Sequence, residues 1–223
     1  MSNVGKLLAS LVMLIGVSYD THADPITVYD TTRSDQGNIN CFCTPDTATY
    51  GQTFVATGES NRLVSFSLFL RGRFAGEETL DLRGYVGECD GTKVRRLLFE
   101  SKTETMNAAG ELQEFAFQPQ LSLHDGTYVA FLSFSNLPPQ PFNEGFEMPW
   151  GSDQIPGQFV FLNSGFDAIR WSLDTWEDFG ATHDVWFKAQ VVGSQAPVPE
   201  PATALLIATA GAIYGIGRRV RKS

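Results

Sequence analysis

Short runs in which apolar and polar residues alternate set the main constraint on this chain. In the run 62–70, every second position from 64 onward is apolar, and serines occupy positions 65 and 67. The run 184–192 repeats the pattern, with apolar residues at 185, 187, 189 and 191. Since successive side chains of a β-strand point to opposite faces, each run predicts a strand with one buried face.

The same reasoning predicts further strands, separated by turns rich in glycine and proline. The expected strands are 26–29, 50–57, 62–70, 79–86, 93–100, 112–118, 128–134, 159–162, 168–171 and 184–192. We expect a long polar loop at 30–48 and an irregular proline-rich segment at 137–156. The body has no long amphipathic helix pattern, so the arrangement predicts an all-β fold, a two-sheet antiparallel β-sandwich.

The last residues form three parts in a fixed order. Pro199-Glu200-Pro201 precedes an uncharged apolar segment, 202–217, and the cations of 218–223 follow. As a helix the segment would be roughly 24 Å long, somewhat short of a bilayer, and flanking arginines can close the gap. A buried core helix is the alternative, but a cluster of cations seldom follows one. We therefore expect a transmembrane helix at 202–217 and a cytoplasmic basic tail.

This three-part end resembles the PEP-CTERM sorting signal of Gram-negative bacteria that make extracellular polysaccharide. The matching residues are Pro199, Glu200, Pro201, Arg218, Arg219 and Arg221. The resemblance implies that an exosortase, a membrane protease or transpeptidase, recognises the signal and that the protein is cut near the motif. It covers residues 198–223 only.

The first residues have the pattern of a cleaved secretory signal. Lys6 precedes the largely apolar run 7–17, and Thr21 and Ala23 are the small residues before a cut at Asp24. A first transmembrane helix is the alternative, but the apolar run is too short for one. The expected organisation is a signal peptide at 1–23, a β-sandwich at 24–192, a linker at 193–201, a transmembrane helix at 202–217 and a basic tail at 218–223.

The body resembles the choice-of-anchor domains found ahead of PEP-CTERM tails. The shared segments are 26–30, 51–54 (Gly-Gln-Thr-Phe), 121–128 and a tryptophan-bearing loop before the last strand. The resemblance implies an exported, jelly-roll-like β-sandwich and supplies no catalytic residues. The loop 30–48 has no place in that pattern.

The chain is acidic, with 16 Lys and Arg against 25 Asp and Glu and a formal net charge of −9. A negative protein repels nucleic acid and anionic lipid, so we expect no nucleic-acid partner. Solubility outside the cell is the plain explanation of the charge.

Three cysteines, Cys41, Cys43 and Cys89, are the thiols of the chain. Exported proteins reach an oxidising compartment, which favours one disulfide. Cys41 and Cys43 flank a single residue, a spacing that rarely suits a bridge between them, so we expect either to pair with Cys89. Free buried thiols are the alternative. A metal site would need more ligands.

The sequence shows no catalytic motif. His124-Asp125 and His183-Asp184 are the adjacent His–acid pairs of the body, and neighbouring strand residues point to opposite faces, so neither pair need form a dyad. Polar residues at turns and strand ends explain both pairs. We therefore expect a protein that is not an enzyme and needs no cofactor.

Aromatic and acidic residues in the later part of the body suggest two binding hypotheses. Trp171 and Trp176 are candidates to stack on a sugar from a loop surface, with ordinary core packing as the alternative. A calcium site is the second hypothesis, with a solvated acidic loop as the alternative. Its candidate ligands are Asp174, Glu177, Asp178 and Asp184.

Together these observations predict an exported, non-enzymatic protein of the cell surface or extracellular matrix, associated with secreted polysaccharide. We expect transient anchoring in the inner membrane, followed by processing by an exosortase-type protease. The alternative is a carbohydrate-binding module or adhesin with one defined glycan ligand.

Overall fold

The computed structural model describes residues 25–58, 61–73, 79–107, 110–141, 145–152, 154–178 and 183–193. They belong to one compact unit, Asp24–Gln195. The predicted signal peptide, the Pro199-Glu200-Pro201 motif, the segment 202–217 and the basic end lie outside the described residues. Within the described part of the chain, no helix is long and apolar enough to cross a membrane.

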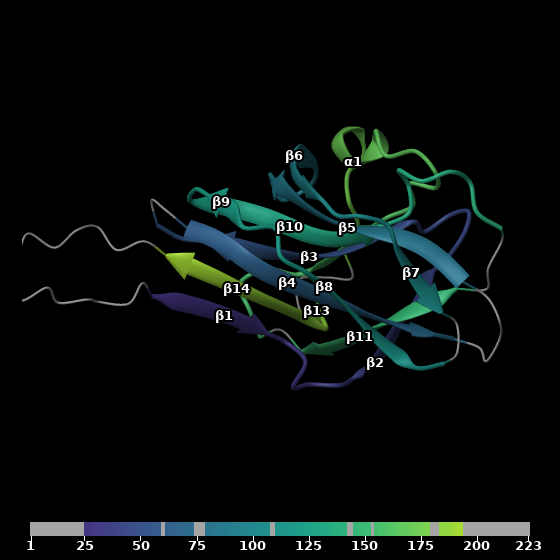
Figure 1. The fold of residues 1–223 in the computed structure, drawn as a ribbon, viewed down its shortest axis with the longest axis horizontal. Coiled ribbons are helices and arrows are strands. Elements are labelled where there is room, and N and C mark those ends of the chain that lie inside the picture. The colour runs from purple at the N-terminus through teal and green to yellow at the C-terminus, as the bar shows by residue number, and fades with distance from the viewer. Residues whose placement is uncertain are drawn as a thin grey trace, which may run out of the picture. The chain divides into compact units, whose positions relative to one another are not determined.

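The described chain is all-β, and its strands form two antiparallel sheets (Figure 1). The larger sheet has eight strands in the order β1-β14-β4-β11-β13, with β2 paired to β11 and with β8 and β9 paired to β4. Its strands are β1 (Ile26–Asp30), β2 (Gly37–Phe42), β4 (Asn61–Gly72), β8 (Leu112–Phe117), β9 (Leu121–Leu123), β11 (Phe146–Ser152), β13 (His183–Val185) and β14 (Phe187–Gly193).

The smaller sheet has six strands in the order β12-β3-β10-β5-β6, with β7 paired to β5. Its strands are β3 (Thr49–Ala56), β5 (Thr79–Cys89), β6 (Val94–Glu100), β7 (Glu104–Asn107), β10 (Gly126–Ser133) and β12 (Phe159–Leu162). One short helix, α1 (Arg170–Leu173), occurs among the described residues.

The main hydrophobic core lies between the two sheets, which makes them a β-sandwich. Phe187 of β14 and Tyr128 of β10 both contact Phe54 of β3, each with ring centroids 5.8 Å apart. The predicted inward positions of the last strands are confirmed, because Val185, Phe187, Ala189 and Val191 are all buried. Each buried phenylalanine contributes roughly 1.5–3 kcal/mol to stability.

A second apolar cluster covers the outer face of the six-stranded sheet. Val129 and Phe131 of β10 point into it, while Tyr128, Ala130 and Leu132 of the same strand point into the main core. Trp171 and Trp176 are the large residues that close this cluster from outside. Strand β10 is therefore apolar on both faces, because it is covered on both.

The inner face of strand β4 differs from the prediction at one residue because the strand contains a β-bulge. Ser65 and Leu63 pair with the consecutive residues Gln190 and Val191, so Val64 is the extra residue. As a result Leu63 is fully buried at the position expected for Val64, while Phe66, Leu68 and Leu70 are buried as predicted.

Two segments expected to be irregular contain strands. The predicted loop 30–48 contains β2, and the proline-rich segment 137–156 contains β11, which pairs with β2 even though Pro149 lies within it. Asparagine, glycine and proline are poor strand formers, so pairing and burial of Phe42, Phe146 and Met148 override local propensity here.

The expected strand at 168–171 is wrong, because these residues lead into helix α1. Asp174 N–H donates to Arg170 O at 2.9 Å, and the two side chains form an ion pair. Only Trp171 of this helix is buried, whereas Ile169 and Leu173 beside it are exposed. A single helical turn can bury one large side chain on one side, and in α1 that side chain is Trp171.

A buried polar contact joins the two sheets. The Asp184 carboxylate, at 0 % exposure, accepts a hydrogen bond of 2.6 Å from Gln52 Nε2 of β3. It also accepts the N–H groups of Gln154, at 2.6 Å, and Ile155, at 3.2 Å. Gln52 Oε1 in turn accepts Val185 N–H at 3.1 Å. This contact fixes β13 and the segment around Gln154 against β3.

We predict that Asp184→Ala lowers the free energy of unfolding by about 3 kcal/mol, because Gln52 Nε2 and the N–H groups of Gln154 and Ile155 lose their acceptor. Urea unfolding followed by circular dichroism measures the loss. Glu111→Ala, which removes an exposed carboxylate, is the matched control and should change stability by less than about 0.5 kcal/mol. Equal losses in the two variants would contradict the assigned role of Asp184.

Candidate functional site

The structure places Trp171 and Trp176 inside the second apolar cluster, with exposures of 5 % and 7 %. Trp171 Nε1 donates to Thr49 Oγ1 at 3.1 Å, and Trp176 Nε1 donates to Trp171 O at 3.0 Å. Both rings contact Phe131 edge-on. A sugar cannot stack on a covered ring, so the expectation that these two tryptophans reach a loop surface is wrong.

A different tryptophan, Trp150, lines a surface hollow of about 380 Å³. The other described residues that line it are Asn38, Ile39, Asn40 and His183. They come from β2, β11 and β13 of the eight-stranded sheet. Trp150 and His183 are half-buried, and their rings pack edge-on with centroids 4.5 Å apart.

Local backbone geometry builds this hollow. Trp150 lies opposite Gly37 on β2 and opposite Val185 on β13. Gly37 has a φ of +124°, which side-chain-bearing residues rarely adopt, and a Cβ there would lie 3.6 Å from Trp150 Nε1. The Trp150 carbonyl accepts Gln36 N–H at 2.9 Å, which ties the start of β2 to the tryptophan.

The hollow offers a half-exposed aromatic ring beside polar residues. Asn38 and Asn40 are the polar residues of β2 that line it, and His183 is the one titratable group among the described lining residues. A half-exposed indole presents apolar area with a specific geometry. Such a surface suits a neutral polar ligand with an apolar face.

Sequence reasoning missed this site because two of the three strands that form it, β2 and β11, look irregular in isolation. Trp150 lies in the proline-rich segment, and Asn38 and Asn40 lie in the expected loop. The alternation of two amides around Ile39 is the signal that could have indicated a half-exposed strand.

The candidate calcium ligands do not gather at one place. Asp174 pairs with Arg170 at 2.6 Å, Asp178 accepts Gln158 Nε2 at 2.8 Å, and Asp184 is buried against Gln52. Glu177 lies on a backbone bridge to Phe161. Among the described residues no group of three or more His, Cys, Asp or Glu could hold a metal ion. The calcium hypothesis therefore finds no support in the described residues.

A buried cluster of hydroxyl groups lies between the sheet and the Trp171 indole. Its members are Thr49, Ser133, Ser135 and Ser164, with oxygen–oxygen distances from 2.7 to 3.3 Å. Within the described residues these hydroxyls bond to one another, to Trp171 Nε1 and to backbone carbonyls. The cluster satisfies buried polar groups and holds α1 against β3.

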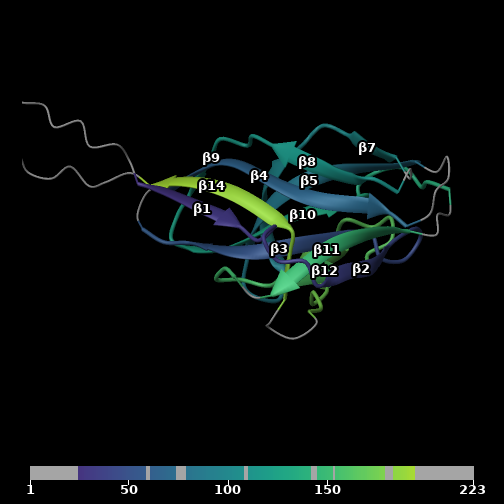
Figure 2. The ribbon, with the colours of Figure 1, turned by 90° about the horizontal axis from the view of Figure 1, so that it is seen from below.

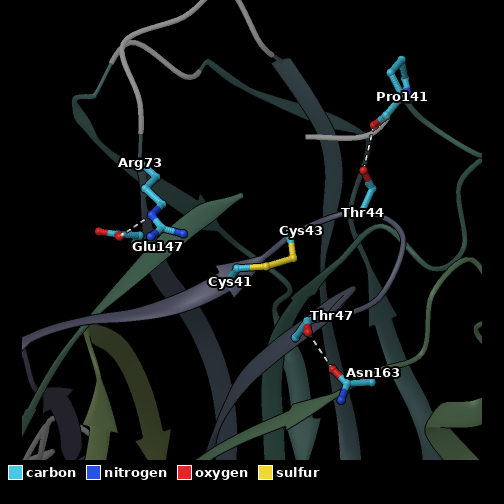
Figure 3. The surroundings of a disulfide bond; sticks show 8 residues. All are labelled: Cys41, Cys43, Thr44, Thr47, Arg73, Pro141, Glu147 and Asn163. Atoms are coloured by element: carbon cyan, nitrogen blue, oxygen red, sulfur yellow. Dashed lines mark hydrogen bonds and ion pairs between the residues drawn. A yellow bond between two sulfur atoms is a disulfide. The ribbon is translucent and has the colours of Figure 1, made fainter. Parts of the chain in front are cut away.

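The disulfide joins Cys41 to Cys43, which corrects the expected pairing with Cys89 (Figure 3). In an extended strand, the Cα atoms of two residues at positions i and i+2, such as Cys41 and Cys43, would be about 6.7 Å apart. Here they are 5.2 Å apart, within the range of disulfides, because β2 ends at Phe42 and the chain turns. Phe42 between them is fully buried.

The loop after the disulfide is held by hydrogen bonds to distant segments. Thr44 Oγ1 donates to Pro141 O at 2.8 Å, and Thr47 Oγ1 donates to Asn163 Oδ1 at 2.6 Å (Figure 3). Cys89 lies at the end of β5 in the other sheet and packs against the second apolar cluster. Its thiol is free, and burial raises its pKa.

No protein-family model, curated protein or solved structure matches this chain.

We predict that the denatured, unreduced protein contains one alkylatable thiol, Cys89. In the native protein, alkylation of this thiol should need a higher pH than alkylation of an ordinary cysteine, because burial disfavours the thiolate. Mass spectrometry after iodoacetamide treatment counts the thiols, and Cys89→Ser should leave none. Two or three modified cysteines in the denatured wild type would contradict the Cys41–Cys43 bridge.

Proposed function

We propose that this chain is an exported, non-enzymatic protein of the cell surface or extracellular matrix that binds secreted polysaccharide through the Trp150 hollow. In this proposal the body is a jelly-roll-like sandwich, and the segment 202–217 anchors it in the inner membrane as a helix. An exosortase-type protease then processes it at Pro199-Glu200-Pro201.

The hollow around Trp150 is the observation that carries the binding part of the proposal. Its volume of about 380 Å³ is in the range of small-ligand sites. The C–H face of a sugar ring fits a half-exposed indole, and sugar hydroxyl groups are suited to hydrogen bonds with the polar residues of the lining, Asn38, Asn40 and His183.

The position of the hollow on the sheet also supports this function. Pro25, just before β1, accepts a hydrogen bond of 2.9 Å from Gly193 N–H, so the chain enters and leaves the described domain at one place (Figure 2). Trp150 pairs with Val185, near the other end of β14. About eight residues along the strand direction separate Val185 from Gly193, roughly 27 Å. A tail attached at Gly193 would therefore leave the hollow at the far end of the domain.

The alternative is a carbohydrate-binding module or adhesin with one defined glycan ligand. The same hollow supports it, because an indole offers a stacking face for a single sugar ring. A glycan array separates the two functions: one strong class of ligand favours the module, and binding restricted to the cells' own matrix polymer favours the structural role.

We predict that Trp150→Ala weakens binding of the secreted polysaccharide of the producing cells about tenfold, since loss of stacking removes about 1.4 kcal/mol. Affinity electrophoresis in gels containing the polymer measures the change. Trp176→Phe keeps an aromatic ring in the buried cluster and is the control that should bind as the wild type does. Unchanged retardation of Trp150→Ala would overturn the binding site.

We predict that the mature protein lacks its arginine-rich end and is found outside the inner membrane. The measurement is the C-terminal mass of the protein from each cell fraction. A Glu200→Gln variant should accumulate uncut in the inner membrane, whereas Gln195→Glu, in the same linker, should be processed normally. A wild-type chain that keeps Arg218–Lys222 in the inner membrane would refute the sorting account.

A further inference from the structure

Strand β1 forms one edge of the eight-stranded sheet. Among the described strands it pairs with β14 alone, from Ile26 opposite Val192 to Asp30 opposite Lys188. An edge strand presents unpaired backbone groups on its free side, and proteins usually protect such edges with lysine, proline or bulges. Residues 26–30, Ile-Thr-Val-Tyr-Asp, contain no lysine or proline, and the β1–β14 register is regular.

The hydrogen-bonding pattern identifies which groups face outward. Gly193 N–H donates to Pro25 O, and Thr31 N–H donates to Phe187 O. In an antiparallel pair the backbone groups of alternate residues point to the same neighbour, so the odd-numbered residues of this segment face β14. The N–H and C=O groups of Ile26, Val28 and Asp30 therefore point away from the sheet.

The side chains along this edge are apolar and exposed. Val28 is 67 % exposed and Ile26 is 56 % exposed, the first and fourth most exposed of the large apolar residues in the described chain. Val28 is the middle of the three outward-facing residues, so the edge is symmetric about it. A twofold axis through Val28 would superpose the outward-facing positions of two such strands.

We propose that a second copy of this chain adds to the β1 edge in antiparallel orientation, with Val28 of each copy opposite Val28 of the other. Ile26 of one copy then lies opposite Asp30 of the second. Three pairs of outward-facing residues exchange backbone hydrogen bonds, and the two exposed valines pack together. The two larger sheets become one continuous sheet.

Charge disfavours the register in which Asp30 pairs with Asp30. Asp30 Oδ1 accepts a hydrogen bond of 2.7 Å from Thr32 Oγ1, which lowers the pKa of Asp30, so the carboxyl group is charged at neutral pH. Pairing Asp30 with Asp30 would set two negative charges directly opposite each other, about 5 Å apart. The Val28 register separates them by four residues, roughly 14 Å along the strands, where salt screens them.

The paired edge and the Trp150 hollow are at different places along the sheet. β14, which carries β1, pairs with β4 at Asn61–Leu68, and β11, which carries Trp150, pairs with β4 beyond it, at Arg71 and Gly72. None of the described residues that line the hollow belongs to β1. If the hollow binds polysaccharide, which rests on the proposed function, a dimer has two sites and can cross-link chains of polymer.

The test is sedimentation equilibrium of the full chain in density-matched mild detergent. Wild type should show a monomer–dimer equilibrium, and Val28→Lys and Val28→Glu should each weaken association at least tenfold, because like charges meet at the axis. An equimolar mixture of the two variants should regain the dimer, since lysine then faces glutamate. Ile169→Lys, at a similarly exposed position just before α1, is the matched control and should dimerise as the wild type does.

The rescue by mixing separates a specific β1 contact from misfolding and from association through the tail. A monomeric wild type at every concentration that stays in solution would overturn the proposal. So would a dimer that persists in both Val28 variants, or a mixture that remains monomeric. None of these measurements involves polysaccharide, so the dimer can fail while the Trp150 site stands, and the reverse.

Discussion

The contact between Asp184 and Gln52 is the interaction on which the arrangement of the two sheets and of the hollow depends. Gln52 belongs to β3 of the smaller sheet, and Asp184 to the short strand β13 of the larger one. A three-residue strand contributes few backbone hydrogen bonds, so a buried carboxylate with three donors holds it in place. His183 precedes Asp184 directly, and its packing on Trp150 follows from that fixed position.

The smaller sheet is covered on both faces, and this explains why Trp171 and Trp176 are buried while Trp150 of the other sheet stays half-exposed. β10 is apolar on both faces, and a sheet covered on one side would expose Val129 and Phe131. The segment with α1 covers them, and Trp171 and Trp176 are its large residues in the cluster. Their indole N–H groups are satisfied internally. Trp150 instead ends an inward-facing row of β11 at the margin of the main core, where its ring remains half-exposed.

The candidate site is made of the segments that were hardest to predict, and the reason is physical. Strands with strict alternation, such as β4, β5 and β14, carry their own signal, since one face is apolar throughout. β2 and β11 contain asparagine, glycine and proline, and each becomes a strand through pairing with the other. Irregular strands leave gaps in the covering of the core, and the hollow between Asn38 and Trp150 is such a gap. The β-bulge in β4 could not be predicted from the local pattern either. It places Leu63 at the buried position that was expected for Val64.

The sequence by itself determined the all-β class, most strands and most of their inner faces, because these depend on neighbours two residues apart. The predictions of an export and a sorting signal also rest on local patterns, and the residues concerned lie outside the described structure. Only the tertiary structure decided that Cys41 pairs with Cys43, that Trp171 and Trp176 are buried, and that Trp150 meets His183. Burial of a ring and the contact between distant residues depend on how segments far apart in the chain pack, which no local pattern records.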